Sequence, residues 1–533
     1  MLLVPPLLLS AVLVTSVEGL QIPFVARPDA TPPPTSSSFS SSSSTASRRP
    51  IDAQSHSLHP FTLRHAFHAP TEQRHLPLSQ LDYTDADLAS LSALSPYSST
   101  QTARSRRLRA HQPNSQAAYH AARRTSFRSA SSSSSAASSS SFPSWADVAD
   151  QAIAKTLEWD ETEIFAPDTD DVETLAALGK MTSNAYTTPD SSGWIDIGGG
   201  WNKSDSFGWK EHGIRGHVFA DDKNETIVIA IKGTSAFIVG GGTETSKNDK
   251  INDNLLFSCC CARVDWSWST VCDCYDSPGT CRQDCLEEAV MTKSAYYPVA
   301  IDLYNNISAI YPRSQIWLTG HSLGGGIAAM LSRTYGVPSV SFESPGDLLP
   351  SRRLHLPLPP RIDRNSTADR PRRSLQDELT THVFHTADPI PMGVCTGTIS
   401  SCAIGGFALE SRCHTGKTIL YDTVDRLGWS VDIRTHPIHI VIDYLLKDDW
   451  GVKPKSASLA SRKGKTSRLF GWWPGKGRKG EDGSEDEGEK DDDDEDEDEE
   501  GGQGGQKHGR GVPEARFEED DCEDCFRWTF IDG

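Results

Sequence analysis

The chain has 533 residues and a formal net charge of −20, and the twenty residues 481–500 alone contribute −15 with 16 acids and one lysine. The remainder is only mildly acidic, so we interpret this run as a solvated tail and expect no nucleic-acid partner. Serine tracts at 36–44 and 131–141 cannot bury enough apolar surface to offset chain entropy. These features argue against several packed domains and favour one large domain.

The first nineteen residues form an apolar N-terminal segment. Met1 to Val17 carries no charge, and the first charged side chain is Glu18. This pattern predicts a secretory signal or a single membrane anchor, and its length does not decide between them. Either would deliver the rest of the chain to a lumen or to the outside of the cell. We find no other stretch apolar enough to cross a bilayer.

Residues 20–143 are rich in Ser, Pro and Arg, and we predict a low-complexity luminal linker that is largely disordered. Histidines cluster at 56–59 and 65–68. We expect them to be exposed to solvent, and metal binding is the alternative. A folded domain is predicted over 144–450, where residues 172–186 show helical spacing after Asp170 and Asp171.

Strands and helices alternate through this domain. The continuous β-branched run 227–231 is typical of a strand covered on both faces of a parallel sheet. The further predicted elements are a helix over 287–310 and strands over 316–319, 337–342 and 382–385. This alternation predicts an α/β fold, in which active-site loops lie at the carboxyl ends of the strands.

Twelve cysteines are present, and seven lie between Cys259 and Cys285 inside a predicted cysteine-rich insert over 240–285. Clusters of this kind usually form disulfides in an oxidising lumen, and zinc binding is the alternative. The insert also holds Trp266 and Trp268, for which we weigh dipping into lipid against simple core packing. Sequons for N-glycosylation occur at Asn202, Asn224, Asn306 and Asn365.

Residues 320–324 read Gly-His-Ser-Leu-Gly, between the apolar run 316–318 and a helix-like stretch rich in small residues. This is the G-x-S-x-G pattern of a nucleophile elbow, in which a sharp strand-to-helix turn exposes a serine hydroxyl. Glycines on both sides permit the tight turn and close packing of the helix. The pattern predicts Ser322 as a nucleophile.

A serine nucleophile needs a base and a group that orients the base. Asp388 follows a predicted strand and precedes Pro389, which suits the orienting acid, although a helix N-cap would look similar. His436 precedes an apolar helix and is the predicted base, with His439 as the alternate. We expect the Leu323 backbone N–H and Thr234 to stabilise the oxyanion.

Three other histidines lie close to these candidates. We expect His321, inside the elbow, to shape the turn, and His382 and His385 to be structural. The chemistry requires no cofactor, and we assign no metal site.

Four segments in order, residues 228–234, 318–325, 340–346 and 388–391, resemble those of the class 3 fungal-type lipases. The N-terminal segment, the cysteine cluster and residues 428–436 are more closely similar to the autophagy-related vacuolar lipases of fungi. The resemblance covers about residues 144–450 and implies an α/β-hydrolase. It matches Ser322, Asp388, His436 and Thr234 to the nucleophile, acid, base and oxyanion residue.

This resemblance also implies a biological setting. It suggests hydrolysis of triacylglycerols or phospholipids by a type II membrane glycoprotein that travels through the Golgi and multivesicular bodies. In the vacuole such an enzyme breaks up autophagic bodies and internal vesicles, and phosphoinositide binding is attributed to the family. The alternatives are a non-catalytic phosphoinositide-binding tether and another serine esterase or thioesterase.

The chain departs from the family pattern in two places. Lys232 stands where many class 3 lipases have arginine, and the long insert replaces the short lid helix. After the domain we predict a disordered tail over 451–533, basic and aromatic at 453–479 and then acidic. The basic part suits either an anionic membrane surface or a linker neutralised by its acidic neighbour.

Overall fold

The structure, a computed structural model, describes most of the chain between residues 57 and 532. The described residues are 57–70, 79–84, 102–133, 157–187, 213–234, 244–262, 270–294, 296–359, 379–396, 400, 402, 405–450, 511–518 and 522–532. All statements below concern these residues.

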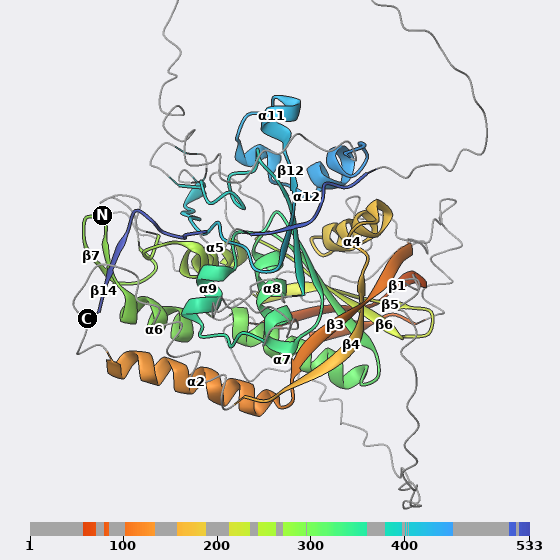
Figure 1. The fold of residues 1–533 in the computed structure, drawn as a ribbon, viewed down its shortest axis with the longest axis horizontal. Coiled ribbons are helices and arrows are strands. Elements are labelled where there is room, and N and C mark those ends of the chain that lie inside the picture. The colour runs from red at the N-terminus through yellow and green to blue at the C-terminus, as the bar shows by residue number, and fades with distance from the viewer. Residues whose placement is uncertain are drawn as a thin grey trace, which may run out of the picture. The chain divides into compact units, whose positions relative to one another are not determined.

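A central sheet of 11 strands organises the fold, in the order β13-β12-β11-β10-β9-β6-β5-β1-β3-β4 with β2 paired to β1 (Figure 1). The strands are β1 (Ser57–Pro70), β2 (Ser79–Asp82), β3 (Thr102–Pro113), β4 (Trp159–Pro167), β5 (Gly213–Asp221), β6 (Thr226–Ile231), β9 (Gln315–His321), β10 (Ser339–Phe342), β11 (Thr380–His385), β12 (Lys417–Tyr421) and β13 (Arg516–Phe517). Strands β6, β9, β10, β11 and β12 run parallel, and β5, β1, β3 and β4 extend the sheet with antiparallel pairing. The predicted α/β fold is therefore confirmed.

Helices and short strands complete the structure. They are α2 (Gln116–Ser133), α4 (Val172–Asn184), α5 (Glu244–Phe257), β7 (Tyr275–Ser277), β8 (Thr280–Arg282), α6 (Gln283–Lys293), α7 (Tyr296–Ile310), α8 (Leu323–Tyr335), α9 (Leu348–Arg353), α11 (Thr423–Leu427), η2 (Ile433–Thr435), α12 (Ile438–Ile440), the π-helical turn η3 (Val441–Leu445) and β14 (Thr529–Ile531). The predicted helix over 287–310 is two helices, α6 and α7. The helix predicted at 172–186 is α4, where Asp171 Oδ2 accepts a hydrogen bond from the Thr174 backbone N–H at 3.0 Å.

Two apolar clusters lie on the two faces of the sheet. One contains side chains of α7 and α8 with Ile227, Ile229 and Ile231 of β6, and the other contains side chains of α4, α12 and η3 with Val228 and Ala230. Alternate residues of β6 thus face opposite clusters. Coverage of both faces explains why this strand is apolar throughout.

The prediction of a disordered linker over 20–143 is wrong for the residues that the structure describes there. Strand β1 pairs with β5, and β3 pairs with both β1 and β4. Arg107 and Arg109 of β3 are exposed and face acids of β4, as in the pair of Arg109 and Glu161 at 3.5 Å, whereas Arg104 and Arg106 lie near Asp171 and Asp170. Small residues fill the buried positions, and Ala103, Ser105 and Ala110 are fully buried.

The prediction of exposure to solvent is also wrong for His59, His65 and His68. His59 Nδ1 lies 3.2 Å from Asp221 Oδ2, and His65 Nδ1 lies 2.8 Å from Asp82 Oδ1. His65 and His68 are buried. For His59 and His65, carboxylate partners from other strands, which the local sequence does not reveal, make it possible to bury the imidazole.

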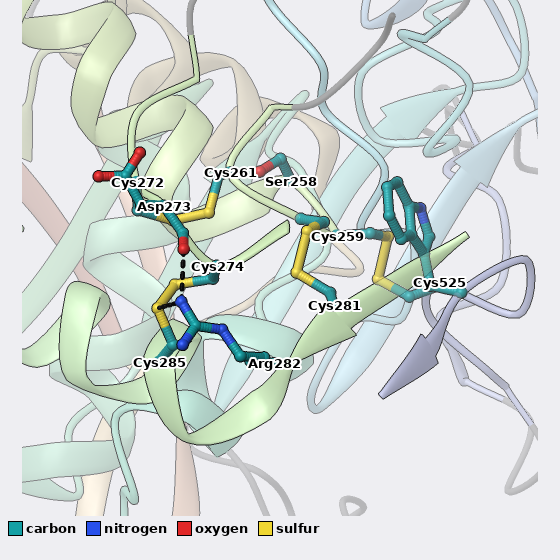
Figure 2. The surroundings of a disulfide bond; sticks show 12 residues. Ser258, Cys259, Cys261, Cys272, Asp273, Cys274, Cys281, Arg282, Cys285 and Cys525 are labelled. Carbon is teal, nitrogen blue, oxygen red and sulfur yellow. Dashed lines mark hydrogen bonds between the residues drawn. A yellow bond between two sulfur atoms is a disulfide. The ribbon is translucent and has the colours of Figure 1, made fainter. Parts of the chain in front are cut away.

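The C-terminal segment likewise departs from the prediction of a fully disordered tail. Strand β13 pairs with β12 at one edge of the central sheet, and β14 pairs with β8. Disulfides join Cys522 to Cys413 and Cys525 to Cys259 (Figure 2 shows the second). These covalent links hold a short segment that has little apolar surface of its own.

All twelve cysteines form disulfides, as predicted. The remaining pairs are Cys260–Cys281, Cys261–Cys272, Cys274–Cys285 and Cys395–Cys402. Cys261, Cys272 and Cys274 lie close enough to share a metal ion, but each of these sulfurs is already bonded to another. Because these sulfurs are in disulfides, the structure favours the disulfide prediction over zinc binding.

Several predictions fall outside the described residues, among them the N-terminal apolar segment, Trp266 with Trp268, and the basic and acidic parts of the tail. In the part of the chain that is described, no helix has both the length and the apolar composition needed to span a bilayer.

Candidate active site

Ser322 stands at the sharp turn between β9 and α8. Its backbone has φ 57° and ψ −130°, a region that non-glycine residues rarely adopt. Such a conformation costs about 1–3 kcal/mol and persists only where surrounding contacts enforce it. The turn therefore has the strained geometry expected of a nucleophile elbow.

The glycines of the elbow permit very close packing. A Cβ on Gly324 would lie 2.3 Å from the Ile231 carbonyl oxygen, and a Cβ on Gly320 would lie 2.3 Å from the Gly324 carbonyl oxygen. Real Cβ atoms do not approach so closely, so α8 can begin against β6 and β9 only with glycine at these positions. This explains the glycine spacing of the motif.

His436 and Asp388 are brought together from segments 48 residues apart. His436 Nδ1 donates a hydrogen bond to Asp388 Oδ2 at 2.6 Å, and both side chains are buried. The Ile390 backbone N–H donates to Asp388 Oδ1 at 3.0 Å, so Asp388 orients a turn and does not cap a helix. With Nδ1 protonated, Nε2 of His436 is the nitrogen that can accept a proton.

His321 ties the elbow to the His436 loop. Its Nε2–H donates to the His436 carbonyl oxygen at 2.9 Å, and the Tyr186 hydroxyl donates to its Nδ1 at 2.7 Å. Burial lowers the pKa of His321 to about 3, so its imidazole stays neutral with this proton arrangement. His321 therefore links the elbow to the His436 loop by hydrogen bonds, in agreement with the predicted role in shaping the turn.

Thr234 follows β6 and lies next to the elbow. A Cβ on the adjacent Gly233 would lie only 3.0 Å from Ser322 Cβ, so this backbone runs directly against the nucleophile candidate. The Thr234 hydroxyl donates a short hydrogen bond to Asp253 Oδ2 on α5. Burial raises the pKa of Asp253 well above its usual range.

Lys232 anchors the same strand end. Its Nζ lies 3.6 Å from Asp249 Oδ2, and the Tyr296 hydroxyl donates a short hydrogen bond to the other Asp249 oxygen. Burial lowers the pKa of Lys232. The position where many class 3 lipases have arginine thus holds a buried ion pair between β6 and α5.

The other candidates are placed as follows. Leu323 is the first residue of α8, directly after Ser322. His439 is exposed, whereas His436 contacts Asp388, so the geometry selects His436 over the alternate. His382 and His385 bind Ser344 and Thr435, respectively, inside the fold.

Sequence reasoning missed the acids that surround these candidates. Asp249 and Asp253 lie four residues apart on α5, a spacing that puts both on one helix face. Glu343 follows a predicted strand at the edge of the sheet where active-site groups gather. Both signals were present in the sequence.

Two of the four predicted glycosylation sites lie in the described residues. Asn224, in the turn before β6, and Asn306, on α7, are both exposed. Asn202 and Asn365 lie outside the described residues.

Comparison with known proteins identifies the family. A relative from Cryptococcus neoformans named "Putative lipase ATG15" is 49% identical over 381 residues, covering 70% of this chain and 70% of its own length. One from Mycosarcoma maydis, of the same name, is 48% identical and covers 72% and 70%, respectively. The chain belongs to the ATG15 lipase family. The resemblance found in the sequence is confirmed, and membership in this family makes the chain a lipid ester hydrolase.

Two further comparisons are narrower. A family model described as a Tle-like phospholipase domain matches residues 281–352, which include the elbow. Among solved structures, Lip2 lipase from Yarrowia lipolytica has 15% sequence identity and covers 46% of this chain and 77% of its own, with a TM-score of 0.24. At that TM-score the likeness adds nothing to the fold that the sheet order establishes.

Proposed function

We propose that this protein is a serine lipase in which Ser322 is the nucleophile, His436 the general base and Asp388 the group that orients the base. The hydrogen bond of 2.6 Å between His436 Nδ1 and Asp388 Oδ2, beside a serine in an elbow conformation, carries this proposal. His321 supports it because it fixes the His436 backbone next to the elbow.

The reaction follows from this arrangement. His436 Nε2 takes the Ser322 proton as the hydroxyl attacks the acyl carbonyl of the lipid. The Leu323 backbone N–H and Thr234 stabilise the oxyanion, and His436 then protonates the departing alcohol oxygen. Water activated by His436 hydrolyses the acyl-enzyme and releases the fatty acid. No step needs a cofactor.

Triacylglycerols, phospholipids or both are the proposed substrates, in autophagic bodies and multivesicular-body vesicles delivered to the vacuole. The names of the ATG15 relatives and of the phospholipase-like domain support a lipid substrate. Six disulfides support an oxidising luminal compartment. A type II membrane anchor in Golgi and endosomal membranes, glycosylation and phosphoinositide binding rest on the family resemblance and the sequons.

Labelling by a fluorophosphonate probe tests the nucleophile. We expect the wild-type protein to be labelled and Ser322→Ala to be silent. Ser105→Ala is the matched control, because Ser105 also contacts a histidine, with Oγ 2.9 Å from His59 Nε2. Labelling that survives Ser322→Ala would refute Ser322 as the nucleophile, and a wild-type protein that is not labelled would favour a non-catalytic tether.

Product analysis identifies the substrate. Wild-type protein and Ser322→Ala are incubated with liposomes that contain both triacylglycerol and phospholipids, and released fatty acids and lysolipids are quantified. Lysophospholipid formed only by the wild type indicates phospholipase action, and diacylglycerol indicates triacylglycerol hydrolysis. If neither appears while a soluble ester is cleaved, the protein is another type of esterase.

A further inference from the structure

A second carboxyl group lies buried behind the proposed catalytic acid. Glu343 follows β10, whose Phe342 pairs with His321 of β9, so Glu343 is level with Ser322 on the adjacent strand. Its side chain is fully buried, Oε1 has no hydrogen-bond partner among the described residues, and the carboxyl lies close enough to Asp388 to interact with it electrostatically. The proposed mechanism gives this group no role.

The backbone at Glu343 is unusual in the same way as that at Ser322. Its φ is 43°, in the left-handed region, and its N–H donates to the Val383 carbonyl oxygen at 2.9 Å. Non-glycine residues hold such conformations where the surrounding structure enforces them, often at functional sites. Adjacent parallel strands thus end in one strained residue each, and both lie at the proposed site.

Among the described residues, the groups that face Glu343 supply no positive charge. His385 donates its backbone N–H to Oε2 at 3.5 Å, and its Nε2 lies 3.7 Å from Oε1. Burial lowers the pKa of His385, so this imidazole is neutral. Tyr421 of β12 faces the same carboxyl, and its pKa is raised by burial and then by Glu343. Asp388 is the remaining neighbour, with His436 beyond it.

Two buried carboxyl groups in contact cannot both be ionised, so they share one proton. Asp388 receives N–H donors from His436 and Ile390, which favour its ionised form. Burial opposes ionisation of Asp388, yet His436 and then Glu343 lower its pKa. Burial and the charge of Asp388 raise the pKa of Glu343 well above its usual range. The shared proton therefore resides on Glu343.

We propose that Glu343 is a positioning residue that, as a neutral acid, donates its O–H to the Asp388 carboxylate and moderates the pull of Asp388 on His436. The inference rests on the proposed function of Ser322, Asp388 and His436. Without this donor, Asp388 turns more freely and attracts the His436 proton more strongly. His436 then becomes protonated at higher pH, where it no longer acts as a base.

The test compares variants that keep and remove the donor. Glu343→Gln keeps an N–H donor of similar shape, and Glu343→Met removes it. Glu410→Gln is the matched control, since Glu410 is a half-buried acid whose pKa is also raised by desolvation, but it binds Cys259 and Trp528. Each protein is assayed for kcat and KM against pH with a soluble short-chain ester, and its melting temperature is recorded.

We expect Glu343→Met to lower kcat by about 10- to 100-fold with little change in KM, as for loss of a hydrogen bond to a charged group. The fall of kcat at low pH should begin at a pH about half a unit to one unit higher than in the wild type. Glu343→Gln should stay within about threefold of wild type in kcat and keep the wild-type acid limb. Glu410→Gln should leave the pH profile in place.

Equal pH profiles and equal kcat for folded Glu343→Met and Glu343→Gln would overturn the inference. If Glu343→Met does not fold, Glu343→Asp is the fallback, because its shorter side chain keeps a carboxyl but moves it away from Asp388. A pH–kcat profile of Glu343→Asp that equals the wild-type profile at low pH would then also overturn the inference. Activity that survives Ser322→Ala instead refutes the proposed function, so the two failures are distinguishable.

Discussion

Several Ser–His–Asp groupings occur in the described residues, and among them the grouping of Ser322 lies at a strand-to-helix elbow. Beside the grouping of Ser322, His436 and Asp388, the antiparallel half of the sheet holds Ser105, His59 and Asp221. Ser105 Oγ lies 2.9 Å from His59 Nε2, and His59 Nδ1 lies 3.2 Å from Asp221 Oδ2. By residue type and contact alone, this second grouping resembles a catalytic triad.

The surroundings separate the two groupings. Ser105 is fully buried within the regular strand β3, between β1 and β4. Asp221 also accepts hydrogen bonds from the backbone N–H groups of Glu225 at 2.7 Å and Thr226 at 3.1 Å, so it holds the turn before β6. A serine hydroxyl acts as a nucleophile only where a substrate carbonyl and oxyanion donors can reach it. Both groupings contain serine, histidine and aspartate, so the backbone geometry around Ser322 is what distinguishes the proposed active site.

The largest expected difference is between the two aspartates. Asp388→Asn should lower kcat by about 10⁴-fold, because the amide stabilises the wrong tautomer of the base. Asp221→Asn should leave kcat within about threefold and lower the free energy of unfolding by about 1–3 kcal/mol. Steady-state hydrolysis of a soluble ester and denaturant unfolding measure these effects. Comparable losses of kcat in both variants would show that the Asp388 and Asp221 groupings do not differ in catalytic role.

The oxyanion donor gives the next largest effect. Thr234→Val removes the hydroxyl that, by donating to Asp253, fixes the Thr234 backbone N–H beside Ser322, and it should lower kcat by up to about 10²–10³-fold with a smaller change in KM. Thr234→Ser keeps the hydroxyl and is the control. A wild-type kcat in the valine variant would show that the hydroxyl does not serve the reaction.

Acid stability tests the antiparallel half of the sheet. Burial lowers the pKa of His217 on β5 from 6.5 to about 4, and its Nε2 donates to the Thr187 carbonyl oxygen. Below pH 6.5, His217 binds a proton in the unfolded chain but stays neutral in the folded protein. The free energy of unfolding therefore falls as the pH decreases from 6.5 towards 4. This loss amounts to about 3 kcal/mol. His217→Gln should flatten the dependence of unfolding free energy on pH between these limits, and an unchanged slope would contradict the assignment.

The smallest expected effect concerns Ser105. Ser105→Ala should lower the free energy of unfolding by about 1 kcal/mol, the usual value of one buried hydrogen bond, and leave kcat at the wild-type level. Thermal unfolding and ester hydrolysis measure the two quantities. A large loss of activity at normal stability would show that this grouping has a chemical role.

Local sequence features were enough to predict the elbow and its strand. The glycines around Ser322 predicted close packing, and the β-branched run 227–231 predicted a strand buried on both faces; both features are found. The expected chain order of a triad also named Asp388 and His436, which the fold joins by a hydrogen bond, and His436 contacts His321, the residue before Ser322. These patterns are readable because turn geometry and strand burial depend on nearby residues.

The sequence could not reveal contacts that depend on distant partners. Strand β3 is rich in arginine, and its sequence alone resembles a linker. In the structure it pairs with β4, where Glu161 and Glu163 lie opposite its arginines. The C-terminal segment is polar, and it becomes structured through disulfides to Cys259 and Cys413.

By itself, the sequence determined the α/β class, the elbow, the candidate triad and the presence of disulfides, because periodicity, glycine spacing and residue type encode these directly. Only the tertiary structure decided which histidine meets Asp388, that Asp253 contacts Thr234, and that Glu343 lies behind Asp388. Such contacts depend on how strands far apart in sequence align at one edge of the sheet. No local pattern contains that alignment.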